Sequence, residues 1–563
     1  MSEHIFIGVA WPYANGPLHL GHIAGAYLPA DIFARYHRLK GNHVLMVSGS
    51  DQHGTPVTIR AEQESVSPQD IAARYHQQFI DCWGELGISF DLFTTTDTPN
   101  HIRVAHDMFL TLLRNGHIYR DVMLQPYCPK CQRFLPDRYL EGLCPYCGLA
   151  NARGDECDEC GRPLNPSDLK DLRCRLCSTP PRFESSEHFF LRLSSFQDRL
   201  AAWIKEQTHW RRNVLGSAWN FLNEGLRDRA ITRDLEWGVT VPQPGFERKR
   251  LYVWFENVIG YLSASKEWAH SLGDDAAWQP FWQGDARGFY FLGKDNIFFH
   301  TLSWPAMLMG YGGLNLPYDV PANEFLTIEG RRLSTSRGWA VWLPDYLARY
   351  DPDPLRYALA ANMPETGDSD FSWQQFLRRN NNELVATYGN LAYRVLTFAH
   401  RNFDGAVPAP GELDEGSRSL LDEAQAILDR VDRSLYRCEF KAAVKEVMSL
   451  AQKANRYLDE QAPWKTIKTH PEASARSVYA VLSVLTALRT AFYPFIPFSS
   501  EKLHSALGFD GGVEEAGWKI QLLPPGQKLR EPQPLFAKLE EDIVAQETSR
   551  LDFQHENQAG TES

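Results

Sequence analysis

The sequence predicts an α/β protein in which a doubly wound parallel sheet is interrupted by a cysteine-rich insertion and followed by an α-helical bundle. Three observations support this prediction. Short apolar runs alternate with helical patterns near the N-terminus. Four Cys-x-x-Cys pairs then fall in one window of about fifty residues. Beyond Asp351, apolar residues recur at the 3.6-residue spacing of helices.

The first elements alternate between strand and helix. Residues 4–10 form an apolar run typical of a buried strand, and turn-forming residues follow at 11–17. We expect a helix from 20 to 39, kinked at Pro29 because proline lacks the N–H of a helical hydrogen bond. A second apolar run at 44–47 predicts the next strand. Strand, loop, helix and strand in this order open a doubly wound parallel sheet.

An insertion rich in Gly, Pro, Cys and charged residues follows at about 127–178, before the α/β pattern resumes near Leu251 and Gly288. In a cytosolic chain, Cys-x-x-Cys pairs predict zinc ligands rather than disulfides. Two pairs close one tetrahedral four-thiolate site, which is structural because it leaves no open position. The pairing can be nested or sequential. The predicted ligands are Cys128, Cys131, Cys144, Cys147, Cys157, Cys160, Cys174 and Cys177, whereas Cys82 and Cys438 are expected to be buried and inert.

The C-terminal part is predicted to be helical. A third helix is expected at about 473–492, and the polar sequence beyond about Gln546 predicts a loose tail. The first two helices are predicted from apolar stripes, Leu384, Tyr388, Leu391, Val395 and Phe398 in one and Phe440, Val444, Val447, Ala451, Ala454 and Leu458 in the other.

The bulk properties exclude some classes of protein. With 563 residues the chain is long enough for three or four domains, and its net charge of −12 argues against a protein that coats nucleic acid through positive charge. The N-terminus lacks the basic segment and long apolar core of a secretory signal. The most apolar stretch, 478–498, contains polar residues and two prolines, which favours a buried helix over a membrane span. We therefore expect a cytoplasmic protein without a membrane partner.

A phosphate-binding turn is predicted where the first strand meets the first helix, at Pro17-Leu18-His19-Leu20-Gly21-His22. Helix N-termini present free N–H groups that attract phosphate, and Gly21 leaves room for a nucleotide against the backbone. His19 and His22 share one helix face and could both donate hydrogen bonds to a triphosphate. Two alternatives are a zinc pair, for which no third ligand follows at suitable spacing, and two ordinary surface histidines.

The segment His19-Leu20-Gly21-His22 resembles the HIGH signature of class I aminoacyl-tRNA synthetases, and the surrounding AWPYANGPLHLGHIAG resembles the methionyl-tRNA synthetase family in particular. The family's second signature, KMSKS, is matched by GRRLSTSRG at 330–338, with Arg332 at the first lysine position and Thr335 at the second. The resemblance covers 5 to about 539. It implies a Rossmann-type catalytic domain with a zinc-knuckle connective insertion, and ligation of L-methionine to tRNA(Met) with ATP and Mg²⁺ through a methionyl-adenylate.

The resemblance also implies roles for single residues. The implied catalytic residues are His19, His22, Lys294, Arg332 and Ser334. The methionine site is implied to contain Ala10, Trp11, Tyr13, Asp51, Trp254, Tyr261, His300 and Trp304, with Asp51 holding the α-ammonium group. The nucleotide and adenylate are implied to contact His19, Gly21, His22, Arg233, Asp295, Arg332, Leu333 and Thr335. Without the resemblance, core packing would be the expected role of each aromatic residue.

Several positions depart from the family's pattern. Trp11 stands at the Leu position of the family's ALPY stretch, and Arg332 stands at the first lysine position of KMSKS. Thr335 offers a hydroxyl but no charge, so we expect Arg332, together with Arg331 or Arg337, to supply the cations that bind pyrophosphate. Asn257 and Val258 replace residues that are usually Ala followed by a small or apolar residue. The resemblance therefore does not define the floor of the methionine pocket at these two positions.

In the helical part, Asn390, Arg394, Pro463 and Trp464 match the family's anticodon-reading residues. Asn390 and Arg394 lie four residues apart on one helix face, and an exposed Trp at a helix end can stack on an unpaired base. A tryptophan in the bundle core is the alternative interpretation. The resemblance also favours nested zinc pairing, with 144/147 and 157/160 on one ion and 128/131 and 174/177 on a second.

The implied division of the chain is a Rossmann catalytic domain in two halves, a connective insertion, a linking region, a helical anticodon-binding domain and a polar tail. The alternatives are another class I aminoacyl-tRNA synthetase and a non-catalytic zinc-containing tRNA-binding protein. Leucyl, isoleucyl and valyl enzymes carry an editing insertion for which this chain has no room. A monomer is expected, because no oligonucleotide-binding domain follows. The expected bounds are 1–116, 117–235, 236–322, 323–360, 361–545 and 546–563.

Overall fold

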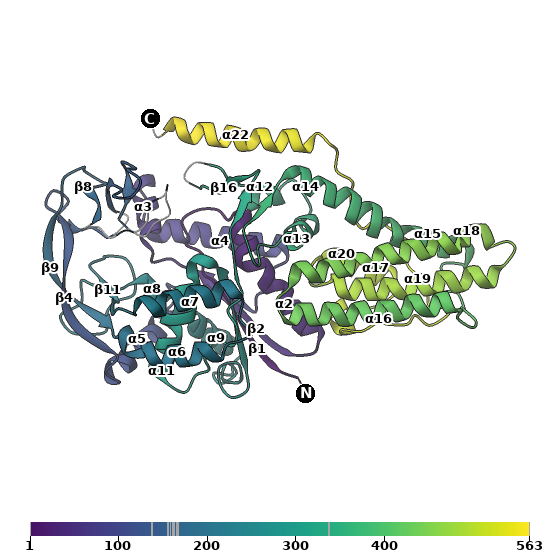
Figure 1. Ribbon diagram of the computed structural model, residues 1–563, viewed down its shortest axis with the longest axis horizontal. Coiled ribbons are helices and arrows are strands. Elements are labelled where there is room, and N and C mark those ends of the chain that lie inside the picture. Colours follow the sequence, from purple (N-terminus) through teal and green to yellow (C-terminus); the bar gives the residue numbers. More distant parts are fainter. Residues whose placement is uncertain are drawn as a thin grey trace.

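The computed structural model describes residues 2–136, 139–154, 157, 159, 164, 168–335 and 338–561. Its centre is a parallel sheet of order β14-β13-β1-β2-β3 (Figure 1). The chain builds outward from β1 in one direction and later returns to its other side. The predicted doubly wound sheet is therefore confirmed, and the carboxyl ends of β1 and β13 flank the switch point at which such sheets bind ligands. The strands are β1 (His4–Val9), β2 (His43–Ser50), β3 (Leu92–Thr95), β13 (Arg287–Gly293) and β14 (Ala322–Asn323).

The first crossover helix differs in one respect from the prediction. It consists of α1 (Leu20–His22), a π-helical segment η1 (Ile23–Tyr27) and α2 (Leu28–Leu39). The N–H of Leu28 bonds to the carbonyl of Ile23, five residues earlier, so the irregularity precedes Pro29. Pro29 itself lies in the first turn of α2, where a missing N–H costs little. The helix is therefore interrupted by a π-helical turn directly before Pro29, and the expected kink at Pro29 stays a prediction.

Helices from both halves of the catalytic part cover the sheet. The first half contributes α3 (Thr55–Glu64), α4 (Pro68–Leu86) and α5 (Pro99–Arg114). After the insertion follow α6 (Gln197–Glu206), α7 (Arg212–Glu224), β11 (Thr232–Arg233), β12 (Arg250–Leu251), α8 (Val253–Glu256), η5 (Asn257–Ile259), α9 (Gly260–Ser271), α10 (Gln279–Trp282), η6 (Lys294–Asn296), η7 (Phe299–Ser303) and α11 (Trp304–Tyr311).

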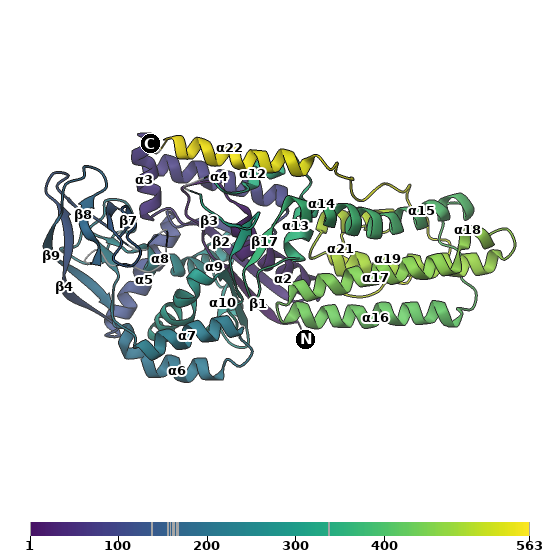
Figure 2. The ribbon, with the colours of Figure 1, turned by 45° about the horizontal axis from the view of Figure 1, so that its top comes forward.

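The insertion is a long antiparallel ribbon that carries the cysteine pairs. Strands β4 (Ile118–Cys128) and β9 (Arg182–Leu191) pair along their length, and the ribbon extends from the catalytic part on the side opposite the helical bundle (Figures 1 and 2). Shorter strands are β5 (Arg133–Phe134), β6 (Leu140–Leu143), β7 (Ala152–Arg153), β8 (Lys170–Cys174) and β10 (Arg229–Ala230), of which β6, β7 and β8 form a separate small sheet.

A small sheet and two helices link the catalytic part to the bundle. The sheet has the order β16-β15-β17, with β15 (Leu326–Ile328), β16 (Arg331–Arg332) and β17 (Ser369–Phe371). The helices are α12 (Leu343–Leu347) and α13 (Pro352–Ala360). The two arginines of the KMSKS-like segment therefore lie on a short exposed strand.

The bundle confirms the three predicted helices. The first stripe spans the π-helical η8 (Arg379–Gly389) and α15 (Asn390–Asn402), which continue from α14 (Trp373–Arg378). The second stripe lies on α17 (Phe440–Gln461), and the third helix is α19 (Pro471–Phe492). The remaining elements are α16 (Glu415–Tyr436), α18 (Pro463–Thr466), α20 (Pro497–Ala506) and α21 (Val513–Ala516). The apolar α19 is buried along most of its length. Within the described residues, no helix has the length and apolar character needed to cross a membrane.

The C-terminal segment is a helix rather than the expected loose tail. Helix α22 (Ile543–Thr561) runs back over the catalytic part, close to α14 (Figures 1 and 2). The Glu547 carboxylate accepts hydrogen bonds from Arg349 (3.1 and 2.8 Å) and from the Tyr350 hydroxyl (2.8 Å), and Leu551 is only 2% exposed. Its buried residues Ile543, Glu547 and Leu551 recur every four residues, but one of them is a charged glutamate, so the sequence shows no continuous apolar stripe.

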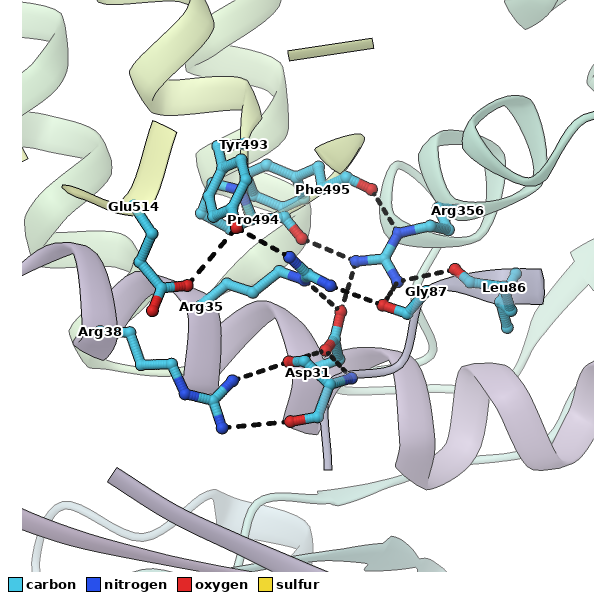
Figure 3. A network of polar contacts seen from close by, with 11 residues as sticks. Asp31, Arg35, Arg38, Leu86, Gly87, Arg356, Tyr493, Pro494, Phe495 and Glu514 are labelled. Carbon is cyan, nitrogen blue, oxygen red and sulfur yellow. Dashed lines mark hydrogen bonds and ion pairs between the residues drawn. The ribbon is translucent and has the colours of Figure 1, made fainter. Parts of the chain in front are cut away.

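A buried ionic network joins the catalytic part to the end of α19 (Figure 3). The Asp31 carboxylate on α2 accepts hydrogen bonds from Arg35 (2.9 Å) and from Arg356 on α13 (2.6 Å). Arg356 is fully buried and also donates to the carbonyls of Pro494 and Phe495, both at 2.9 Å. With the carbonyls of Leu86 and Gly87, both at 3.3 Å, this guanidinium bonds to groups from three parts of the chain that are distant in sequence.

Candidate active site at the switch point of the sheet

The turn after β1 positions both predicted histidines. His19 is the N-cap of α1, and its Nδ1 accepts the backbone N–H of Gly21 at 3.1 Å. The backbone N–H of His19 donates to Nδ1 of His22 at 3.2 Å, and the two rings stack with their centroids 3.8 Å apart. A capping box of two histidines therefore holds both rings in one orientation.

These hydrogen bonds determine which ring nitrogen carries the proton. A nitrogen that accepts a backbone N–H is unprotonated, so the neutral ring carries its proton on Nε2. Burial lowers the pKa of His22 to about 4, and burial followed by the neighbouring His22 lowers the pKa of His19 well below its ordinary value. At neutral pH both rings are therefore uncharged and have Nε2–H as their remaining donor.

The KMSKS-like segment packs directly against this turn. A Cβ on Gly21 would lie 3.0 Å from Cδ1 of Leu333, so any side chain there would press on that segment. The N–H of Leu20 donates to the carbonyl of Val341 (3.1 Å), and His19 forms a bridge with Trp342. The structure thus brings the two predicted signatures together at the end of β1.

Arg332 of this segment and Lys294, which follows β13, both lie near Phe325, a residue that the sequence did not indicate. The Lys294 ammonium lies 4.1 Å from the ring centroid of Phe325, and the Arg332 guanidinium lies 5.4 Å from it. Lys294 also pairs with Glu324 (2.7 Å) and Asp368 (2.9 Å), whereas Arg332 is exposed. Arg332 is therefore the more available cation of the two in this conformation.

The remaining residues of the segment have different environments. Arg331 stacks over Trp339, with its guanidinium 4.5 Å from the ring. Ser334 bridges to Trp339, which closes the segment into a hairpin-like loop that also contains Thr335. Ser336 and Arg337 lie outside the described residues, so the predicted participation of Arg337 stays a prediction.

Asp51 lies at the end of β2, beside the turn. It forms a backbone bridge with Tyr13 and is 2% exposed. Its carboxylate accepts the backbone N–H of His53 at 3.2 Å and the side-chain amide of Asn257 at 2.7 Å. Burial and then the nearby Glu256 raise the pKa of Asp51 to about 8, against the opposing effects of His53 and Asn257.

Glu256 belongs to a buried chain of polar groups behind Asp51. It is fully buried and bonds to His53 (3.0 Å) and His101 (2.6 Å). Burial alone would lower the pKa of His53, but the carboxylates of Glu256, Asp97 and Asp51 raise it to about 10. The imidazole is therefore a cation between Glu256 and Asp97. Sequence patterns did not predict the roles of Glu256, His53 and His101, because the three are far apart in the chain.

The β1 end of the predicted methionine site is closely packed. The Trp11 indole fits against two glycines, since a Cβ on Gly49 or Gly260 would lie 2.4 or 2.7 Å from its ring atoms. The ring of Tyr13 similarly covers Gly54. The carbonyl of Ala10 accepts the hydroxyl of Tyr27 at 2.9 Å. The missing side chains of Gly49 and Gly260 therefore leave the room that the Trp11 indole occupies.

Of the aromatic residues predicted to line the methionine site, Tyr261 and His300 form a hydrogen-bonded pair, whereas Trp304 lies in the core. The Tyr261 hydroxyl bonds to Nε2 of His300 at 2.7 Å, and Nδ1 of His300 contacts the carbonyl of Asn296 at 2.9 Å. Because burial lowers the pKa of His300 to about 4, the ring is neutral, with its proton on Nδ1. Trp304 is fully buried and donates to the hydroxyl of Tyr290, so the structure places it in the core.

The other predicted contacts lie at the edges of this wall. Trp254 is 39% exposed and packs against Tyr252 and Phe299, as expected of an aromatic surface that a substrate covers. The Arg233 guanidinium lies 4.0 Å from the Tyr252 ring centroid. Burial raises the pKa of Asp295, which follows β13 at the same end of the sheet.

The cysteine pairs group as in the nested arrangement. Cys128, Cys131, Cys174 and Cys177 come together, with three of their sulfur–sulfur distances at 3.4, 3.5 and 3.9 Å. Four thiolates at about 2.3 Å from a zinc ion stand about 3.8 Å apart, so this donor set fits a tetrahedral ion. Cys144, Cys147 and Cys157 form the other group, and the predicted fourth ligand, Cys160, lies outside the described residues.

The predicted anticodon residues meet at the far end of the bundle. The Arg394 guanidinium on α15 lies 4.9 Å from the ring centroid of Trp464 on α18 and bonds to Asp459 at 3.3 Å. Trp464 is 41% exposed, so the bundle-core interpretation of this tryptophan is wrong. Asn390 is exposed one turn before Arg394, and Pro463, which directly precedes the tryptophan, is buried. Asn390, Arg394 and Trp464 thus offer one surface.

Family models match nearly the whole chain. The model of class I tRNA synthetases (M) matches residues 5–396, and the model of the anticodon binding domain of methionyl tRNA ligase matches residues 407–556. A methionine--tRNA ligase of Dehalococcoides mccartyi is 59% identical, covering 98% of this chain and 100% of that protein. One of Thermomicrobium roseum is 52% identical and covers 98% and 99%.

Solved structures agree with these relatives. The Mycobacterium tuberculosis methionyl-tRNA synthetase in complex with methionyl-adenylate superposes with a TM-score of 0.80 at 26% identity. The match covers 95% of this chain and 99% of that chain. The similarity therefore includes the sheet, the insertion and the bundle together.

Proposed function

The chain belongs to the methionyl-tRNA synthetase family of class I aminoacyl-tRNA synthetases, and on that basis we propose how its own residues divide the work. It activates methionine with ATP and transfers it to tRNA(Met) through a methionyl-adenylate. The residue assignment rests on one observation: the turn that carries His19 and His22 (the histidine turn), the KMSKS-like segment 330–338 (the arginine loop) and Asp51 lie together at the switch point of one sheet.

In the first step, the methionine carboxylate attacks the α-phosphorus of ATP in line and pyrophosphate leaves. His19 and His22 donate their Nε2–H groups to phosphate oxygens, and their neutral state leaves this donor in place at neutral pH. The exposed Arg332 moves onto the pyrophosphate as its charge develops, assisted by Arg331. The enzyme contributes position and charge rather than a covalent intermediate. Mg²⁺ enters with the ATP phosphates as part of the substrate.

Methionine is held at both of its ends. The Asp51 carboxylate binds the α-ammonium group, and the wall of Tyr13, Trp254, Tyr261 and His300 receives the thioether. Sulfur packs favourably against the edges of aromatic rings. In the second step, the terminal ribose hydroxyl of the tRNA attacks the carbonyl carbon of the adenylate, and AMP leaves.

Two structural zinc ions and an anticodon surface complete the proposal. Cys128, Cys131, Cys174 and Cys177 would hold one ion, and Cys144, Cys147 and Cys157 would hold the other together with Cys160. Bound zinc would supply a rigid cross-link at the end of the ribbon and no open catalytic position. Trp464 would stack on an unpaired base, while Arg394 and Asn390 bond to base edges.

Methionine-dependent ATP–pyrophosphate exchange tests this function. The purified chain should exchange label with L-methionine and not with leucine, isoleucine, valine or cysteine. Arg332→Ala should lower the exchange rate by roughly 100-fold, as expected when a charge-stabilising donor is removed. Thr335→Lys, which restores a cation at the second signature position, is the matched comparison. An unchanged rate in Arg332→Ala would remove the arginine loop from the mechanism.

A further inference from the structure

The carboxylate that is proposed to bind the methionine ammonium group faces an electrostatic difficulty. Asp51 is almost fully buried, and Glu256, a second buried carboxylate, lies near it. Both features favour the protonated form of Asp51, which would bind a cation poorly. Within the described residues, the charged groups that shift the pKa of Asp51 are Glu256 on α8 and His53 in its own loop.

Asn257 offsets this difficulty. It directly follows Glu256 in the chain, and its side-chain Nδ2 donates to Oδ2 of Asp51 at 2.7 Å. The other carboxylate oxygen accepts the backbone N–H of His53 at 3.2 Å. Each oxygen of Asp51 thus has one donor, which fixes the rotation of the carboxylate and favours its ionised form.

We propose that Asn257 is a positioning residue for methionine binding, which orients the Asp51 carboxylate and favours the ionised form that binds the α-ammonium group. The inference rests on the proposed role of Asp51. It assigns a function to a position where this chain departs from the family's pattern. Asn257 acts on the amino end of the substrate, and the thioether wall does not depend on it.

This mechanism predicts a selective defect. Asn257→Ala should raise KM for L-methionine about ten-fold or more, because a hydrogen bond to an ionised group is lost. KM for ATP and kcat should change by less than two-fold. The inhibition constant of L-methioninol, which keeps the ammonium group, should rise together with KM. The inhibition constant of 4-(methylthio)butanoate, which has no amine, should stay within two-fold of the wild-type value.

The pH profile supplies a second readout. The donor from Asn257 lowers the pKa of Asp51, so its removal should raise that pKa further. The deficit of Asn257→Ala in methionine affinity should therefore be largest at pH 6.5 and shrink as the pH rises to 9. A general loosening of the pocket would give the same deficit at every pH.

Four further variants complete the test. Asn257→Asp keeps the shape of the side chain but removes the donor and adds a charge, so it should raise KM more than Asn257→Ala does. Asn100→Ala is the matched control, because the Asn100 amide bonds to the carbonyl of Ser263 in the same part of the protein. It should leave KM for methionine unchanged. In an Asp51→Asn background, Asn257→Ala should have little additional effect.

The outcomes separate the two levels of the argument. If Asp51→Asn leaves KM for methionine unchanged, the ammonium site is elsewhere and the proposed role of Asp51 fails. If Asp51→Asn raises KM but Asn257→Ala does not, only the role of Asn257 is refuted. Equal increases for methionine, methioninol and the desamino analogue would also refute it, since they would show a non-selective change in the pocket.

Discussion

The network around Arg356 predicts that the catalytic part and the bundle lose stability together when this side chain is removed (Figure 3). In Arg356→Met, Asp31 loses its 2.6 Å ion pair, and the carbonyls of Pro494 and Phe495 lose their 2.9 Å donors. Removing one partner of a buried pair costs about 3–5 kcal/mol. Asp31 keeps Arg35, whose guanidinium also holds its pKa well below the ordinary value, so the lower limit applies. We expect a loss of about 3 kcal/mol in the free energy of unfolding.

The assay is urea unfolding followed by two probes, together with the ratio of tRNA charging to pyrophosphate exchange. Arg38→Met is the matched control, because Arg38 lies on α2 with Asp31, and among the described residues its hydrogen bonds go to Ser89 and Asp91 within the catalytic part. Arg356→Met should unfold at clearly lower urea than this control. It should also lose more charging than exchange, since charging needs both parts in place. Equal midpoints and an unchanged ratio in the two variants would refute the reasoning.

Three other predictions follow from the site. Burial lowers the pKa of His300 to about 4 in the folded chain, against about 6.5 in the unfolded chain, so between these pH values the unfolded chain binds more protons. The free energy of unfolding should therefore fall by about 2 kcal/mol through this group as the pH is lowered from 7 to 5. His300→Gln should flatten that part of the curve of stability against pH. Cys128→Ser should reduce the zinc content measured by metal analysis from two ions per chain to one, and fewer than two in the wild type would contradict the nested model. Trp464→Ala should raise KM for tRNA by roughly ten-fold with exchange unchanged, whereas Tyr393→Ala, which alters another exposed aromatic of the bundle, should leave it near wild type.

Features with a local repeat could be predicted from the sequence. The strands β1 and β2 follow from short apolar runs, α17 and α19 follow from helical spacing, and the zinc ligands follow from Cys-x-x-Cys pairs. Each pattern is complete within one element, so no knowledge of distant contacts is needed. The histidine turn was predictable for the same reason, because both rings are held by backbone groups of the turn itself.

Features that depend on distant partners could not be predicted. The hydrogen bond between Asn257 and Asp51 joins residues 206 positions apart, and Phe325 approaches Lys294 and Arg332 only in the folded chain. The π-helical turn before Pro29 and the docking of Glu547 also arise from packing rather than from a sequence period. Family resemblance located Asp51, but the groups that control its charge became visible only in the structure.

The central claim is that ATP and methionine bind at one switch point, with the nucleotide on the histidine turn and the amino acid on Asp51. A crystal structure with a non-hydrolysable methionyl-adenylate analogue tests it most directly. The account predicts the phosphate within hydrogen-bonding distance of Nε2 of His19 and His22, and the ammonium group on the carboxylate that Asn257 orients. A nucleotide bound away from both histidines, or an ammonium group held by another residue, would contradict it.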